Sequence, residues 1–310
     1  MPRRHDTPAS PPVNPHPALP RTSGGTLVSS RSRDSSSGGG REASMGYQRI
    51  LSVVNEQTGS TVAARYAIAL AAAGGSELVL YAAHGEGTDG STLLHTERHL
   101  DHLFRIAFER DIPVTRITES GMIARLLPRR VEEERVGLVF YPLIPPECYG
   151  AAFQQQAVHQ LLRLVRADLA IMRIMHMGKL HPHHILVPLG GRTGSRERLA
   201  DFISLLAKSF HSPVTLFHRP GGRGPSRLEN LALLRDNLLR QQVQVLERSA
   251  TGRIARAIVV EAVSHHHDLI VLGASERGTL RRLFFGNPAG DVMQHPPCNA
   301  ILFRQAPDRP

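Results

Sequence analysis

Two glycine-bearing segments in the second half of the chain have residue types and spacing suited to holding a phosphate. The apolar run Leu269–Leu272 ends at Gly273, and the run Ile185–Leu189 ends at Gly190. Backbone N–H groups between a strand and a helix can hold an anion, and ligands of open α/β sheets bind at the carboxyl ends of strands. We therefore predict one ligand site from both segments. Its candidate residues are Gly190, Gly191, Arg192, Gly273, Ala274, Glu276, Arg277, Gly286 and Asn287.

Each segment also has a simpler interpretation. Gly190 to Ser195 matches neither the Walker pattern nor the dinucleotide fingerprint, and a tight turn with Ser195 as helix N-cap is the simpler interpretation of this segment. In the other segment, Glu276 would lie near a bound phosphate. Two like charges about 5 Å apart repel by on the order of 3 kcal/mol at an effective dielectric of about 20, which Arg277 would partly offset. Phosphate binding and an empty pair of turns are therefore both open.

Residue patterns for catalysis are missing from the sequence. It contains no GxSxG and no HExxH, and neither Cys148 nor Cys298 lies near a recognisable base. Glu276 is the one carboxylate placed to assist hydrolysis of a bound phosphate compound. We expect binding without turnover, with slow hydrolysis of the ligand as the alternative.

Histidines form two clusters before predicted strands of the second half. One comprises His181, His183 and His184, and the other runs from His265 to His267. Imidazole suits zinc and nickel, but no carboxylate-plus-histidine ligand spacing accompanies the clusters. Loops favour polar residues, so we predict solvated loop histidines and no metal cofactor.

Apolar runs alternate with segments of helical spacing from Tyr47 onward. The first half is predicted to have strands at 49–54, 78–81, 113–117, 136–141 and 169–174, and helices at 60–70, 97–109, 122–134 and 155–165. Ser60 is expected to cap the first helix, and Pro128 to kink or break the third. The alternation indicates right-handed βαβ units and a parallel sheet.

The same motifs occur twice in the same order. The matching pairs, with their separations in residues, are Ile50-Leu51 with Ile185-Leu186 (135), Gly121–Arg125 with Gly252–Arg256 (131), and Ala170-Ile171 with Ala300-Ile301 (130). Ordered matches with small drift in separation indicate a tandem duplication. We predict an α/β fold with two tandem open parallel five-stranded sheets flanked by helices.

The chain divides into a tail and two domains. Residues 1–45 are rich in Ser, Gly and Pro and cannot bury enough apolar surface to offset the entropy of ordering, so we expect a disordered tail. The first domain spans 46–177, and the second, which carries the glycine segments, spans 181–305. Met45 directly precedes the first regular segment, and we expect translation to start there, which the intact mass of the native protein tests.

The stretch from Gly273 to Asn287 resembles the C-terminal signature of the universal stress protein family: glycine, two residues, glycine, nine residues, glycine, then Ser or Thr. Gly273 and Gly286 match the first and third glycines, while Glu276 and Asn287 replace the second glycine and the hydroxyl residue. The Gly-Asn-Pro form is similar to that of stress-protein domains appended to transporters. The resemblance implies a Rossmann-like fold for each half and an ATP or other adenine-nucleotide site.

The resemblance also implies where the two halves differ. The family usually has an Asp at the end of its first strand to hold the nucleoside, and Asn55 and Gly190 occupy the two corresponding places. Pro142 stands in the first half where the second has Gly273, so we expect a structural or regulatory role for the first half.

Domains of the family pair through their last strands, which predicts an internal pseudo-dimer or a homo-oligomer. The family's strand order also places both histidine clusters at one lower edge of the second sheet.

Net charge and hydropathy argue against two classes of protein, those that bind specific nucleic acids and those that span a membrane. The formal net charge is +10 and 41% of the residues are hydrophobic, but no aromatic-rich basic stripe appears that would stack bases, so we predict solvated arginine-rich faces and no specific nucleic acid. No apolar run reaches the roughly 18 residues of a membrane span, and no secretion signal is evident. A soluble, cytoplasmic protein is expected.

These features together predict a regulatory protein. It would bind an adenine nucleotide or another phosphate-bearing ligand weakly in the second domain. The alternative is an interaction module that binds no nucleotide and acts on a partner protein such as a transporter or another stress protein.

Overall fold

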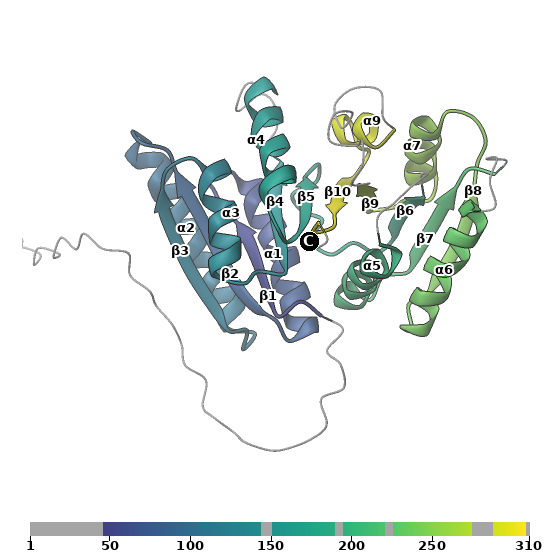
Figure 1. The fold of residues 1–310 in the computed structure, drawn as a ribbon, viewed down its shortest axis with the longest axis horizontal. Helices are drawn as coiled ribbons and strands as arrows, with labels where there is room; N and C mark the ends of the chain where they lie inside the picture. The colour runs from purple at the N-terminus through teal and green to yellow at the C-terminus, as the bar shows by residue number, and fades with distance from the viewer. Residues whose placement is uncertain (1–45, 144–150, 190–194, 221–225, 275–287, 308–310) are drawn as a thin grey trace, which may run out of the picture.

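The computed structural model describes residues 46–143, 151–189, 195–220, 226–274 and 288–307, in which strands and helices alternate in both halves (Figure 1). The first half comprises β1 (Arg49–Val53), α1 (Thr58–Gly74), β2 (Glu77–His84), α2 (Gly90–Phe108), β3 (Val114–Ser120), α3 (Ile123–Glu133), β4 (Leu138–Leu143), α4 (Ala151–Leu164) and β5 (Asp168–Arg173). The second half comprises β6 (Ile185–Leu189), α5 (Arg196–Phe210), β7 (Val214–His218), α6 (Ser226–Arg240), β8 (Val245–Ser249), α7 (Ile254–Ser264), β9 (Leu269–Ala274), α9 (Pro288–Gln294) and β10 (Asn299–Arg304).

The strands of the described residues form one sheet in the order β3-β2-β1-β4-β5-β10-β9-β6-β7-β8. Neighbouring strands within each half are parallel, and β5 pairs antiparallel with β10, with Ala300 opposite Arg173 and Arg304 opposite Leu169. The two parallel five-stranded sheets are confirmed, and they join edge to edge into a continuous sheet. The pairing of the halves through their last strands is likewise confirmed.

Helices from both halves cover each face of this sheet. Buried side chains of α1, α2, α5 and α6 pack on one face, represented by Leu70, Leu103, Phe202 and Leu238. Side chains of α3, α4, α7 and α9 pack on the other, represented by Leu127, Leu161, Ile258 and Val292. The core therefore runs through the joint between the halves, where α1 lies against α5.

Two helix ends follow from local chemistry. Gly75 adopts the left-handed conformation (φ 64°) and donates its N–H to the carbonyl of Ala71, which ends α1. Helix α2 begins at Gly90, earlier than residue 97, because the Asp89 carboxylate accepts bonds from the backbone N–H groups of Ser91 and Thr92, both at 2.9 Å.

The structure corrects two expectations about helices, the cap of α1 and a break in α3. Gln57, and not Ser60, is the N-cap of α1, since the Ser60 hydroxyl donates to the Gln57 carbonyl at 2.8 Å from inside the first turn. Helix α3 also continues through Pro128. A proline removes one intrahelical bond, and the burial of Leu127 and Val131 against the sheet offsets that loss.

Candidate ligand-binding site

Of the predicted phosphate-binding residues, the structure places two. Gly273 and Ala274 are the last residues of β9, opposite Phe303 and Arg304 of β10. Gly190, Gly191, Arg192, Glu276, Arg277, Gly286 and Asn287 lie outside the described residues. Gly273 thus lies at the carboxyl end of a central parallel strand, where ligands of such sheets bind.

The strands beside this position separate toward their carboxyl ends. β6 pairs with β9 only at Ile185–Leu269 and Leu186–Ile270, although β6 continues to Leu189. The first half repeats this geometry, because β1 and β4 pair only from Ile50 to Ser52. Chain order reverses at both places, so each is a topological switch point with a crevice between the diverging strands.

The second half has a hollow beyond the ends of β7 and β8. It measures about 530 Å³ and is open to solvent, and its described lining residues are Arg219, Pro220, Thr251, Gly252 and Arg253. Arg253 is the N-cap of α7, where the helix dipole also favours an anion. The hollow therefore brings together two guanidinium-bearing residues that the sequence analysis did not single out.

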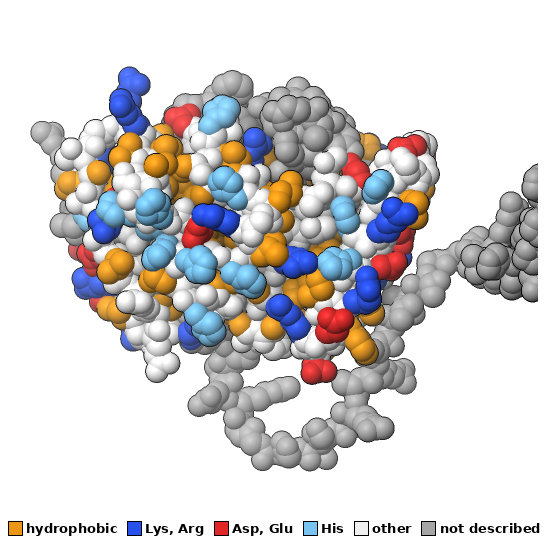
Figure 2. Space-filling model, turned by 180° about the vertical axis from the view of Figure 1, so that it is seen from behind, with side chains coloured by type: hydrophobic (Ala, Val, Ile, Leu, Met, Phe, Trp, Pro, Cys, Tyr) orange, Lys and Arg blue, Asp and Glu red, His pale blue; other side chains and the backbone are white. Residues whose placement is uncertain are grey.

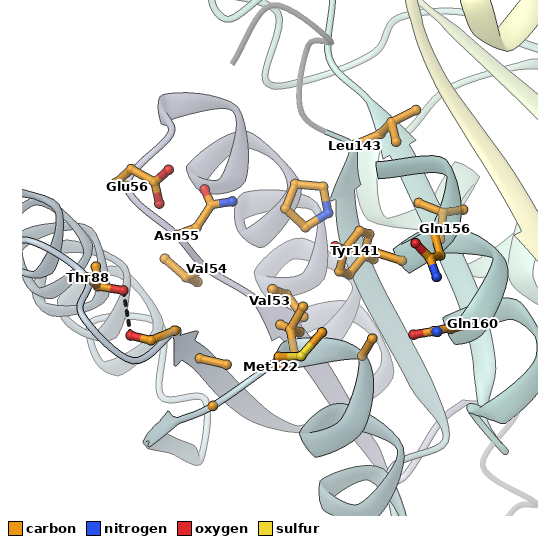
Figure 3. Close-up of a pocket in the computed structure, with 18 residues that line it drawn as sticks. Val53, Val54, Asn55, Glu56, Thr88, Met122, Tyr141, Leu143, Gln156 and Gln160 are labelled. Atoms are coloured by element: carbon orange, nitrogen blue, oxygen red, sulfur yellow. Dashed lines mark hydrogen bonds between the residues drawn. The ribbon is translucent and has the colours of Figure 1, made fainter. Parts of the chain in front are cut away.

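The first half has a more enclosed cavity of about 400 Å³ in its own crevice (Figure 3). Its lining comes from the ends of β1, β2 and β4, from the turn before α3 and from α4. The described lining residues are Val53, Val54, Asn55, Glu56, Ala83, Gly85, Thr88, Gly121, Met122, Ile123, Ala124, Tyr141, Pro142, Leu143, Gln156, Ala157, Val158 and Gln160. No ligand site was predicted in this half, because it has no glycine loop.

The repeat makes the two crevices comparable residue by residue. Pro142 lies opposite Met172 and Gly273 opposite Phe303, the same register in each half, so the predicted equivalence of Pro142 and Gly273 is confirmed. Gly121 and Gly252 both adopt positive φ (137° and 93°) before a helix, which makes Met122 the counterpart of Arg253.

The strand register also identifies the first-half counterpart of the other arginine in the hollow. Leu78 lies opposite Ile50 and Val214 opposite Ile185, and five residues later Ala83 corresponds to Arg219. The two arginines of the second hollow therefore replace an alanine and a methionine of the first cavity. Sequence repeats aligned the halves, but only the structure shows that the exchanged residues line a cavity in the first half and a hollow in the second.

A half-buried polar network supports the strand that leads into the first cavity. Glu119 of β3 accepts bonds from the Tyr81 hydroxyl at 2.8 Å and from Arg130 of α3 at 2.6 Å. Burial acts to raise the pKa of Glu119, but the bonds from Arg130 and Tyr81 outweigh it and hold that pKa below its ordinary value. The ion pair ties β3 to α3, and Gly121 between them lines the cavity.

The two histidine clusters of the second half meet at one edge of the sheet, as predicted. The backbone N–H of Asp268 bonds to the His184 carbonyl at 3.1 Å, and the rings of His184 and His267 lie 6.4 Å apart. The prediction of solvated histidines is wrong for His267, which is buried just before β9. Burial lowers the pKa of His267, although Glu261 at 3.5 Å acts in the opposite direction. Within the described ranges, no group of three histidine, cysteine or acidic residues is arranged to hold a metal ion.

Histidine is a general surface feature of this protein. Figure 2 shows histidines spread over one face of the molecule, among basic and apolar side chains. Exposed examples occur in both halves, at His95, His102, His176, His211 and His295. This wide distribution is typical of solvated side chains and not of a single cluster that shares one chemical function.

Two other features bear on the class of protein. Cys298 is buried, and burial raises the pKa of its thiol to about 12, so the reactive thiolate is scarce at neutral pH. Among the helices of the described segments, none has the length and apolar character needed to cross a membrane.

Comparison with known proteins supports the family resemblance that the glycine pattern predicts. Residues 222–304 match the model of the Universal stress protein family. The fold is similar to a universal stress protein from Archaeoglobus fulgidus DSM 4304 (TM-score 0.60, 11% identity, 84% of this chain and 97% of that chain). It is also similar to a functionally unknown protein, PA1789, from Pseudomonas aeruginosa PAO1 (TM-score 0.57, 16% identity, 85% and 95%).

A third structure is the cytoplasmic domain of a prokaryotic cation chloride cotransporter (TM-score 0.54, 11% identity, 84% of this chain and 96% of that chain). No curated protein matches the chain in sequence. At these identities the structures establish a common fold over both halves, and the family match confirms the predicted resemblance in the second half.

Proposed function

Because residues 222–304 match the universal stress protein family, we propose that this chain is a regulatory protein that binds a phosphate-bearing ligand in its second half. An adenine nucleotide such as ATP is the foremost candidate. The proposal places the protein in the cytoplasm, where ATP is available, and assigns it no catalytic turnover.

The observation that carries this proposal is the pair Arg219 and Arg253 in one hollow at the ends of β7 and β8. Guanidinium groups make strong, often bidentate bonds to phosphate oxygens. Gly273 ends β9 in the same half and lets a ligand approach the backbone closely. The predicted segments around Gly190 and Gly286 would then supply backbone donors to the same ligand.

Calorimetric titration of the full chain with ATP and Mg²⁺ tests the proposal. We expect binding that Arg253→Glu weakens by roughly tenfold or more, since it replaces an attraction to phosphate with a repulsion. Arg110→Glu is the matched control, because it makes the same change of charge at an exposed position before β3 in the first half. No heat at millimolar ATP from a folded protein would refute nucleotide binding.

Hydrolysis can be followed on the same sample. The rival proposal of a slow ATPase requires phosphate release that depends on Glu276, the candidate carboxylate from the sequence. Binding with no release above that of the Glu276→Gln variant would support a regulatory site, and release lost in that variant would favour the ATPase.

An interaction module is the second candidate. Its support is β8, which among the described strands pairs only with β7 and exposes Leu246, together with the fold shared with the cytoplasmic domain of a transporter. An open edge strand can add a strand from another chain. Sedimentation of the full chain beside Leu246→Lys tests one form of it, association between copies, which the added charge should reduce.

A further inference from the structure

The first-half cavity differs in chemistry from the site proposed above. Among its described lining residues there is no lysine or arginine, and Glu56 is the one charged side chain. A phosphate placed here would meet the Glu56 carboxylate, and none of the described lining residues would offer that phosphate a cation. The lining therefore selects against anionic ligands, in contrast to the arginine-bearing hollow of the second half.

Most of the cavity wall is apolar. Val53 ends β1 and Val54 follows it, while Met122 is the N-cap of α3, Ile123 begins that helix and Leu143 ends β4. The volume of about 400 Å³ lies within the range of about 300–1,000 Å³ that is typical of small-molecule sites. The cavity is thus built to take the apolar body of a small molecule from water.

Polar groups occur at two opposite sides of the cavity. Figure 3 shows Asn55 and Glu56 on the β1 side and Gln156 and Gln160 on the α4 side, with Tyr141 between them. Among the described residues, none hydrogen-bonds to the side-chain amides of Gln156 and Gln160, which lie one helical turn apart. Side-chain amides both donate and accept, so they match a carboxamide or hydroxyl on a ligand.

Other polar groups of the cavity are already engaged. The Thr88 hydroxyl donates to the Gly85 carbonyl at 2.8 Å, and the Asn55 side chain accepts from the Gln57 N–H at 3.0 Å. These bonds hold the rim of the cavity in shape, while the two glutamines remain suited to ligand recognition.

We propose that the cavity between β1 and β4 binds an uncharged small molecule with an apolar, ring-sized body and a carboxamide or hydroxyl group. Its body would lie against Val53, Met122 and Leu143, and its polar group would bond to Gln156 and Gln160. The chain would then hold two sites of different chemistry in one continuous fold, one for a neutral ligand and one for an anion.

The test uses naphthamide and naphthyl phosphate, which share a ring system and differ in charge. Fluorescence titration of the full chain should show binding of naphthamide that Met122→Arg weakens by roughly tenfold or more, because a charged side chain then fills the mouth of the cavity. Leu164→Arg is the matched control, since Leu164 and Met122 are both 52% exposed and Leu164 is not among the lining residues. Naphthyl phosphate should show no dependence on residue 122.

A second variant guards against effects of one substitution on folding. Ala83→Arg places the counterpart of Arg219 in another wall of the cavity and should weaken naphthamide binding in the same way. Thermal unfolding checks that the variants are folded. Absence of naphthamide binding, equal loss in Leu164→Arg, or tighter binding of naphthyl phosphate at this cavity would each overturn the proposal. ATP binding in the second half is expected to be unchanged by Met122→Arg, so the two sites can fail separately.

Discussion

Asp168 and Asn299 make the same contact in opposite directions across the joint between the two halves. Asp168 begins β5, and its carboxylate accepts from the N–H of Ala306, just after β10, at 2.7 Å. Asn299 begins β10, and its side-chain oxygen accepts from the N–H of Met175, just after β5, at 2.8 Å. The duplicated residue thus closes both ends of the antiparallel strand pair that joins the sheets.

Asp168 is charged and Asn299 is neutral, so we expect their removal to lower the free energy of unfolding by unequal amounts. Asp168 also accepts from Tyr47 at 2.8 Å and pairs with Arg198 of α5. Asp168→Ala should lower the free energy of unfolding by roughly 3–5 kcal/mol, since it leaves buried donors and a cation without their partner. Asn299→Ala should cost about 1–2 kcal/mol. Urea unfolding of both variants measures the difference, and equal losses would contradict the role of the charge.

Glu119 should make stability depend on pH in the acid range. Its folded pKa is held below the ordinary 4.5 by Arg130 and Tyr81, so its contribution is present above that value and is lost as pH falls through the lower folded pKa. Glu119→Gln should therefore be less stable than the parent at neutral pH. The gap should close in acid, which unfolding curves at a series of pH values would show. A gap that did not change with pH would argue against the ion pair.

His267 should act in a different pH range. Burial lowers its folded pKa below the ordinary 6.5, and nearby His184 and His265 lower it further, while Glu261 raises it. The sign follows from the net lowering: stability is full above pH 6.5 and falls as pH drops through the folded pKa. His267→Phe should remove this part of the acid sensitivity. Thermal midpoints compared between neutral and mildly acidic buffer measure it, with His266→Phe, at an exposed position, as control.

Gly121 and Gly252 occupy equivalent turns in the two halves, so alanine substitutions at these two positions can be compared directly. Both have positive φ, which costs a residue with a Cβ roughly 1–2 kcal/mol. A Cβ at Gly121 would also lie 3.1 Å from the Leu126 side chain, whereas at Gly252 it would meet nothing within 4 Å. Gly121→Ala should therefore be the more destabilising of the two in chemical unfolding. The reverse order would show that the two turns are not equivalent.

Local patterns in the sequence predicted the elements and the repeat. The run Leu269–Leu272 lies within β9, and Ile50 and Ile185 lie at the start of equivalent strands because the duplication preserved the apolar periodicity. Gly75 ends α1 for a similarly local reason, since glycine adopts the left-handed conformation without a steric penalty. The break predicted at Pro128 was wrong because burial of its neighbours against the sheet outweighs a local preference.

The candidate site was only partly predictable. The glycine spacing led to Gly273, whose place at a strand end is confirmed, and most of the other predicted residues lie outside the described ranges. Arg219 and Arg253 went unnoticed because no motif marks them. They belong to one hollow only because β7 and β8 end side by side.

The sequence by itself thus determined the α/β class, the tandem duplication and the strand at Gly273, because these depend on periodicity and on properties of single residues. Only the tertiary structure decided the antiparallel joint of β5 with β10, the caps by Asp168 and Asn299, and the cavity between β1 and β4. These features depend on contacts between segments far apart in the chain. Such contacts form when strand register and helix packing place the segments together, and no local preference specifies that placement.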